Sequence, residues 1–126
     1  MVLLSPWAAG PEATSDADVV VSVTHFAAHR RRDVPLIAGT GLRLRLGWFA
    51  MPGAVGLCLW SDPLAARSGS ISVWTSEEDL RRFIRLPAHV AVMRRFRDRG
   101  VVRATSWSAG AFDPSAVVAR ARGWIA

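Results

Sequence analysis

The sequence contains no lysine, asparagine, glutamine or tyrosine, and it has a single cysteine, Cys58. One cysteine excludes an internal disulfide and fits the reducing conditions of the cytoplasm. Because Cys58 stands in the apolar run VGLCLW, we interpret it as a buried and inert thiol. No basic segment precedes the apolar residues at the N-terminus, so we expect no signal peptide and a cytoplasmic protein.

Long uncharged stretches are missing as well. The longest, residues 46–61, is interrupted by MPG and is too short to span a bilayer. The 126 residues, about half of them hydrophobic, fit one globular domain. We expect a loose N-terminal arm over residues 1–17, which are rich in small residues, Pro and Gly, and a single domain over residues 18–126.

All 16 basic residues are arginines, and the formal net charge is +6. Arginine without any lysine is typical of the composition of a GC-rich genome, and the arginines are spread over several segments. The tryptophans could stack on bases, but Trp48, Trp60, Trp74 and Trp107 stand in strand-like runs, where core packing is expected. We therefore predict no nucleic-acid partner. An anionic small molecule or a propionate-bearing cofactor could use the same positive charge.

Hydrophobic patterning predicts an α+β chain. A long helix begins with a capping box, either Thr75 with Glu78 or Ser76 with Asp79, and ends at Gly100. Asp113 and Pro114 begin a short C-terminal helix. The expected strands cover residues 18–27, 42–49, 54–61, 70–75 and 101–107, with a basic connection over 29–39.

This order of elements is ferredoxin-like. Helix covers one face of the antiparallel sheet, and we expect the other face to pack against a second copy. Two such sheets form a dimeric α+β barrel around a pocket, so a homodimer is predicted.

The stretch SVWTSEEDLRRF resembles the strand-to-helix segment of the dimeric α+β barrel superfamily, which includes antibiotic-biosynthesis monooxygenases and haem-degrading monooxygenases. The ending ATSWSAGAFDPSAVVARARGWI resembles an uncharacterised-domain family of that superfamily, and GLCLWSDPLAARSGSISVW resembles its spheroidene-monooxygenase-like members. The resemblance covers roughly residues 54–125.

The resemblance implies an oxygenase-like enzyme of secondary metabolism that acts on a hydrophobic small molecule. In members that need no cofactor, the substrate itself reacts with oxygen, and the protein supplies an apolar pocket and a base. In the haem-degrading members, a histidine on this helix is the axial ligand, and His89 lies close to one helical turn earlier. Those enzymes also use an asparagine on the first strand, which this chain lacks.

His89 is therefore the candidate catalytic residue, as a base or, if haem is bound, as the axial ligand. On a helical wheel, His89, Met93 and Phe96 form a stripe separate from the main apolar stripe that should cover the sheet. The main stripe consists of Leu80, Phe83, Ile84, Pro87, Val90 and Ala91. The patterning leaves three interpretations open: a solvated helix histidine, an acid–base or ligand contact in a pocket, and haem ligation.

The substrate-binding candidates share apolar or aromatic character on this helix or on the strands beside it. They are Trp74, Phe83, Met93, Phe96, Trp60, Trp107 and His25. His25 and His29 do not share one face of a strand, so no metal site is predicted. The cofactor is expected to be either none or haem. The rival to an enzyme is a hydrophobic-ligand-binding module without catalysis.

Overall fold

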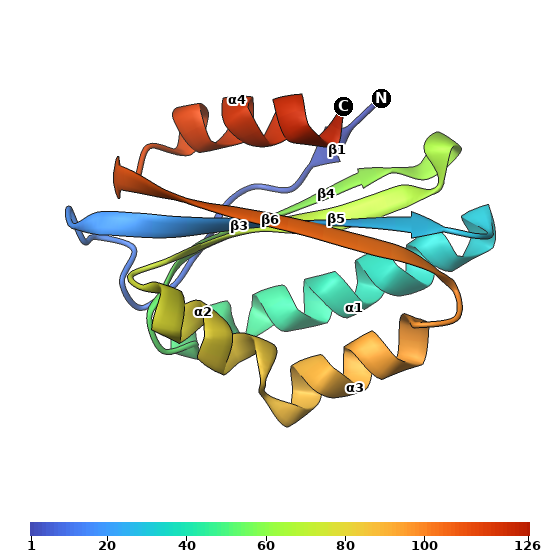
Figure 1. The fold of residues 1–126 in the computed structure, drawn as a ribbon, viewed down its shortest axis with the longest axis horizontal. Coiled ribbons are helices and arrows are strands. Elements are labelled where there is room, and N and C mark those ends of the chain that lie inside the picture. The colour runs from blue at the N-terminus through green and yellow to red at the C-terminus, as the bar shows by residue number, and fades with distance from the viewer.

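The computed structural model describes residues 1–126 as one antiparallel sheet of six strands between two layers of helix (Figure 1). The strands are β1 (Leu3–Leu4), β2 (Ala8–Ala9), β3 (Asp18–Ala28), β4 (Ala54–Asp62), β5 (Arg67–Trp74) and β6 (Gly100–Ala111). The helices are α1 (Val34–Leu46), α2 (Glu77–Ile84), α3 (Pro87–Phe96) and α4 (Pro114–Ile125).

The order β3-α1-β4-β5-α2/α3-β6 confirms the predicted α+β, ferredoxin-like fold. The strands lie in the order β1-β4-β5-β3-β6, and β2 also pairs with β4. β3 lies between β5 and β6, and its valines at alternate positions, Val19, Val21 and Val23, are all buried. Thr24 of β3 pairs with Ser70 of β5 on one side and with Ala104 of β6 on the other.

The prediction of a basic connection and a strand over residues 29–49 is wrong. This region forms α1, followed by a 3-10 turn at Trp48–Ala50. Leucine and arginine are strong helix formers, and Pro35 occupies the first turn, where proline is tolerated. The alternation of Leu and Arg therefore resembles a strand pattern, although the segment is helical and pairs with no strand.

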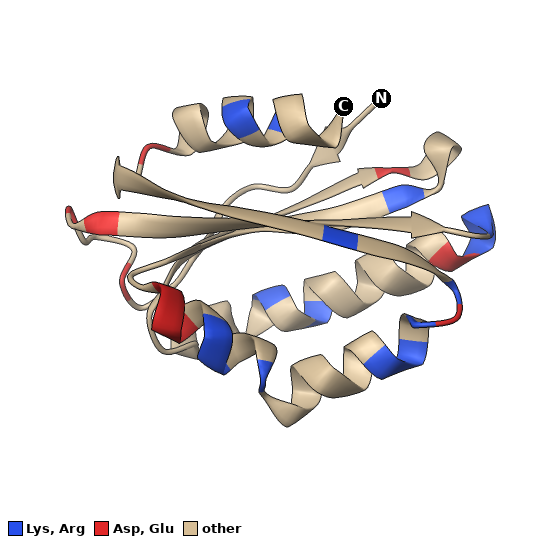
Figure 2. Cartoon of the chain, in the orientation of Figure 1, with Lys and Arg blue, Asp and Glu red and all other residues tan.

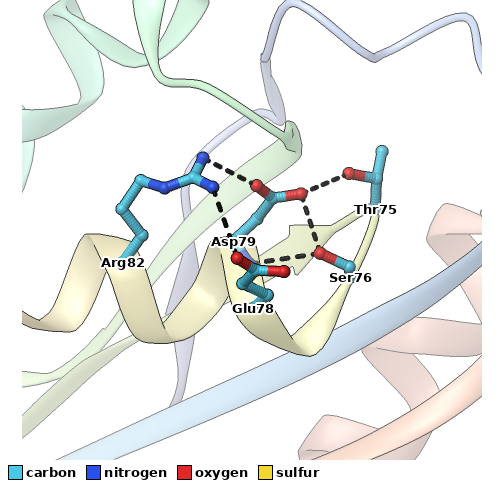
Figure 3. A network of polar contacts seen from close by, with 5 residues as sticks. All are labelled: Thr75, Ser76, Glu78, Asp79 and Arg82. Atoms are coloured by element: carbon cyan, nitrogen blue, oxygen red, sulfur yellow. Dashed lines mark hydrogen bonds and ion pairs between the residues drawn. The ribbon is translucent and has the colours of Figure 1, made fainter.

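The predicted long helix is two helices. Leu86 adopts an extended conformation, as residues before proline tend to do, so the chain turns between α2 and α3 with Pro87 at the start of α3. Of the two predicted capping boxes, the one formed by Ser76 and Asp79 is present at the start of α2 (Figure 3). The Asp79 amide donates to Ser76 Oγ at 3.1 Å, while Thr75, Ser76 and Arg82 all donate to the Asp79 carboxylate. These contacts, with the Thr75 hydroxyl first, hold the pKa of Asp79 below its ordinary value.

The sheet face expected to be open is covered within the chain. Helix α4 lies over it (Figure 1), and its residues Val117, Ala121 and Ile125 join a buried cluster with the valines of β3. The spacing of four residues places these three side chains on one side of α4. A partner is therefore not needed to bury this face.

Residues 1–17, expected as a loose arm, lie against the sheet. β1 and β2 pair with β4. Trp7 packs edge-on against Phe112, with ring centroids 5.0 Å apart. This segment adds apolar contacts to the α4 side of the sheet.

Candidate functional site

A hollow of about 460 Å³ lies beside α3, open to solvent on one side. It is formed by the end of α2, the outer part of α3 and the first residues of β6. The lining residues are Ile84, His89, Val90, Met93, Arg94, Arg97, Gly100 and Val102. The hollow thus combines an apolar wall with one imidazole and two guanidinium groups.

His89 is held in place by the break between α2 and α3. A continuous helix would pair the Ile84 carbonyl with the amide four residues later, and the break leaves that carbonyl free. His89 Nδ1 lies 3.1 Å from it, and the imidazole packs edge-on against Phe83 at 4.8 Å. Because a carbonyl only accepts hydrogen bonds, Nδ1 carries the proton in the neutral ring and Nε2 has a free lone pair. Burial lowers the pKa of His89, which favours this neutral form.

The sequence analysis did not identify a row of hydroxyl groups on the side of the sheet that faces α1, α2 and α3. Ser22 pairs with Ser72, and Thr24 pairs with Ser70. Thr24 Oγ1 and Ser70 Oγ are 2.8 Å apart. Serine at every second position of β5 was the available signal, but only the strand register brings these groups together. These hydroxyl groups bond within the sheet and do not line the His89 hollow.

Three of the aromatic candidates on this side of the sheet do not line the hollow. Trp74 is fully buried in a cluster with Trp48 and Phe83. Phe96 is buried against Phe26, with ring centroids 6.2 Å apart. Of the predicted stripe, the structure therefore places His89 and Met93 together in the hollow and turns Phe96 toward the sheet.

The sheet separates the remaining candidates from His89. Trp60, Trp107 and His25 lie on the face covered by α4. Trp60 is buried and donates through Nε1 to the carbonyl of Thr24 at 3.0 Å. Trp107 packs under the guanidinium of Arg120, 4.5 Å from its ring centroid. Alternation along a strand sends neighbouring side chains to opposite faces, so these residues and His89 do not share a pocket.

His25 is buried between tryptophan rings without a hydrogen bond to either nitrogen. Its ring lies 5.4 Å from that of Trp60 and 6.2 Å from that of Trp124 on α4. Desolvation, and next the charges of Arg103 and Arg67, lower the pKa of His25. Protonation is therefore unfavourable in the folded protein.

We expect His25 to make the fold acid-sensitive. As the pH falls through about 6.5, the unfolded chain takes up a proton on this imidazole while the folded chain does not, so the free energy of unfolding decreases. Urea unfolding at about pH 7.5 and about pH 5.5 should show a smaller loss for His25→Phe than for the unmodified protein. Equal losses would show that His25 does not carry this dependence.

No group of three or more His, Cys, Asp or Glu side chains is placed to hold a metal ion. No helix has the length and hydropathy needed to cross a membrane. Cys58 is buried, and burial raises the pKa of its thiol, in line with the inert role expected for it.

No family model and no curated protein matches the sequence. Solved structures do match the fold. SnoaB, a cofactor-independent oxygenase from Streptomyces nogalater, is 21% identical, with a TM-score of 0.60 over 78% of this chain and 99% of SnoaB. A ferredoxin-fold protein from Listeria monocytogenes related to antibiotic biosynthesis monooxygenases is 18% identical, with a TM-score of 0.58 over 73% of this chain and 57% of that protein.

The haem-degrading enzyme LmHde from Listeria monocytogenes is also similar, with 18% identity and a TM-score of 0.53 over 67% of this chain and 59% of LmHde. Identities this low establish the architecture and leave the reaction open. The chain therefore has the ferredoxin-like fold of the antibiotic-biosynthesis-monooxygenase-like proteins.

Proposed function

We propose that this protein is a cytoplasmic, oxygenase-like enzyme of secondary metabolism that binds a hydrophobic small molecule in the His89 hollow. The observation that carries the proposal is the 3.1 Å contact between Nδ1 of His89 and the Ile84 carbonyl. Nδ1 is held by this carbonyl, so Nε2 of a neutral imidazole is free to accept a proton. Ile84, Val90, Met93 and Val102 supply apolar surface beside it.

The chemistry requires little from the protein. Nε2 would take a proton from an acidic O–H or C–H group of the substrate, and the resulting anion is the electron donor to dioxygen. The similarity to SnoaB, a cofactor-independent oxygenase, supports this reaction class.

The test is oxygen uptake with a panel of polycyclic phenols and polyenes. His89→Ala should lower kcat about 100-fold or more, since a positioned general base contributes at least this much. Because the pKa of His89 is lowered, the rate should hold as the pH falls to about 6.5 and decline only below it. Arg81→Ala, on the exposed side of α2, is the control and should keep the full rate. Full activity of His89→Ala would overturn the assignment.

Haem is the second candidate, and one observation favours it. Histidines that bind metals usually donate their other ring N–H to a carbonyl or carboxylate, as Nδ1 of His89 does here. His89 would be the axial ligand, and Arg94 and Arg97 could pair with the propionates. Haem would supply redox chemistry with oxygen. Titration with haemin should then give a Soret band that His89→Ala removes. Ligand binding with neither oxygen uptake nor a Soret band would indicate a carrier.

We further propose a homodimer formed through β6. One edge of β6 pairs with no strand, and Val101 and Val102 are exposed by 57% and 43%. Antiparallel pairing of two copies would give the backbone groups of both edges partners. Sedimentation at micromolar concentration should give the mass of two chains. A stable monomer under these conditions would contradict the homodimer.

A further inference from the structure

A second hollow, of about 300 Å³, lies where β3 leads into α1 and α3 leads into β6. It is lined only by polar and charged side chains: His29, Arg30, Arg32, Asp33, Asp98 and Arg99. The two connections are joined by the amide of His29, which donates to the Arg99 carbonyl at 2.8 Å, and by Arg99 Nη1, which donates to Asp33 Oδ1 at 3.2 Å. Residues far apart in the sequence thus build one polar recess.

Positive charge in this recess is not balanced within the chain. Asp33 is buried and paired with Arg99. Arg30, Arg31 and Arg32 form no ion pair and no side-chain hydrogen bond with the rest of the protein. Figure 2 shows basic segments of both connections gathered at the same end of the molecule. Adjacent guanidinium groups without carboxylate partners repel one another, and an anion would relieve that repulsion.

We propose that this hollow is a binding site for a phosphate group, with Arg30 and Arg32 as its main ligands. Guanidinium groups bind phosphate oxygens in a bidentate manner, which suits paired arginines. Asp98 faces the same recess and opposes the anion, so it limits affinity. The site is distinct from the His89 hollow and does not depend on the function proposed for it.

The phosphate could be free or part of a larger molecule. The two hollows adjoin at the α3–β6 connection, because Arg97 and Gly100 line one while Asp98 and Arg99 line the other. An ester with an apolar group could therefore reach from the basic hollow toward the apolar one. Inorganic phosphate, diphosphate and phenyl phosphate distinguish these sources.

The test is thermal unfolding with each anion, at an ionic strength held constant with sodium chloride. A ligand that binds only the folded protein raises Tm in a saturable manner, and we expect such a rise with phosphate and a larger one with diphosphate. Tighter binding of phenyl phosphate than of inorganic phosphate would assign the site to an ester, and equal or weaker binding would assign it to the free ion. A rise that chloride reproduces at equal ionic strength would overturn the site.

Variants make the test specific. Arg30→Ser and Arg32→Ser, both exposed positions, should each weaken phosphate about tenfold, as expected for the loss of one charged hydrogen-bonding partner. Asp98→Asn should strengthen it. Arg43→Ser, an exposed arginine of α1 outside the hollow, removes the same charge and should leave affinity unchanged. Equal weakening by Arg43→Ser, or unchanged affinity in Arg30→Ser and Arg32→Ser, would contradict the proposal.

Discussion

Trp74→Ala should lower the free energy of unfolding by about 3–5 kcal/mol. Trp74 is fully buried at the end of β5, beneath α2. Its ring lies 5.1 Å from those of both Trp48 and Phe83, and its Nε1 donates to Ser72 Oγ at 2.9 Å. Truncation removes these contacts and leaves a cavity that the strands on either side cannot close.

Chemical denaturation of Trp74→Ala, Trp74→Phe and Leu64→Ala would test this. Trp74→Phe keeps an aromatic ring but loses the hydrogen bond, and it should fall about 1–2 kcal/mol below the unmodified protein. Leu64 is 79% exposed, so Leu64→Ala should change stability by less than about 0.5 kcal/mol. Similar losses in Trp74→Ala and Leu64→Ala would show that Trp74 does not anchor this cluster.

Gly69→Ala should cost at least about 3 kcal/mol, at the upper end of the range for overpacking. A Cβ at residue 69 would overlap the carbonyl oxygen of Thr24 and lie 2.6 Å from Nε1 of Trp60. It would therefore push apart the hydrogen bond between Trp60 and Thr24. Both obstacles are held in the middle of the sheet, so neither can move without disturbing strand pairing.

Gly39→Ala is the matched control. Gly39 lies inside α1, and a Cβ there would meet nothing within 4 Å. Because alanine is favoured over glycine in a helix interior, this substitution should raise stability by up to about 1 kcal/mol. The same chemical change is thus expected to act in opposite directions at the two sites, and thermal unfolding of the pair would show it. A loss at both positions would mean that the environment of Gly69 is not responsible.

Local signals in the sequence identified most elements. Asp113 and Pro114 start α4 as predicted, and Ser76 caps α2. Leu80 and Phe83 of the predicted apolar stripe are buried, but the stripe does not continue into α3, because Ile84 is 46% exposed and Pro87 and Ala91 are exposed as well. These features depend on residues within one or two turns of each other, so composition and spacing are sufficient to find them.

Region 42–49 shows where such signals fail. Leu42, Leu44 and Leu46 alternate with arginines, yet Leu44 packs toward the core while Leu42 and Leu46 are 53% and 84% exposed. The pattern is compatible with a strand only if a neighbouring strand supplies hydrogen bonds. No neighbouring strand supplies them, because this segment belongs largely to α1, which connects β3 to β4.

The sequence by itself determined the fold class, the starts of α2 and α4, and His89 as the candidate base. The tertiary structure decided that His89 is held by the carbonyl of Ile84, that His25 lies across the sheet from it, and that Arg30 and Arg99 line one recess. Strand propensity and helix caps act between near neighbours in the chain. The position of a side chain relative to a distant one depends instead on strand register and helix docking, which are fixed only when the whole sheet assembles.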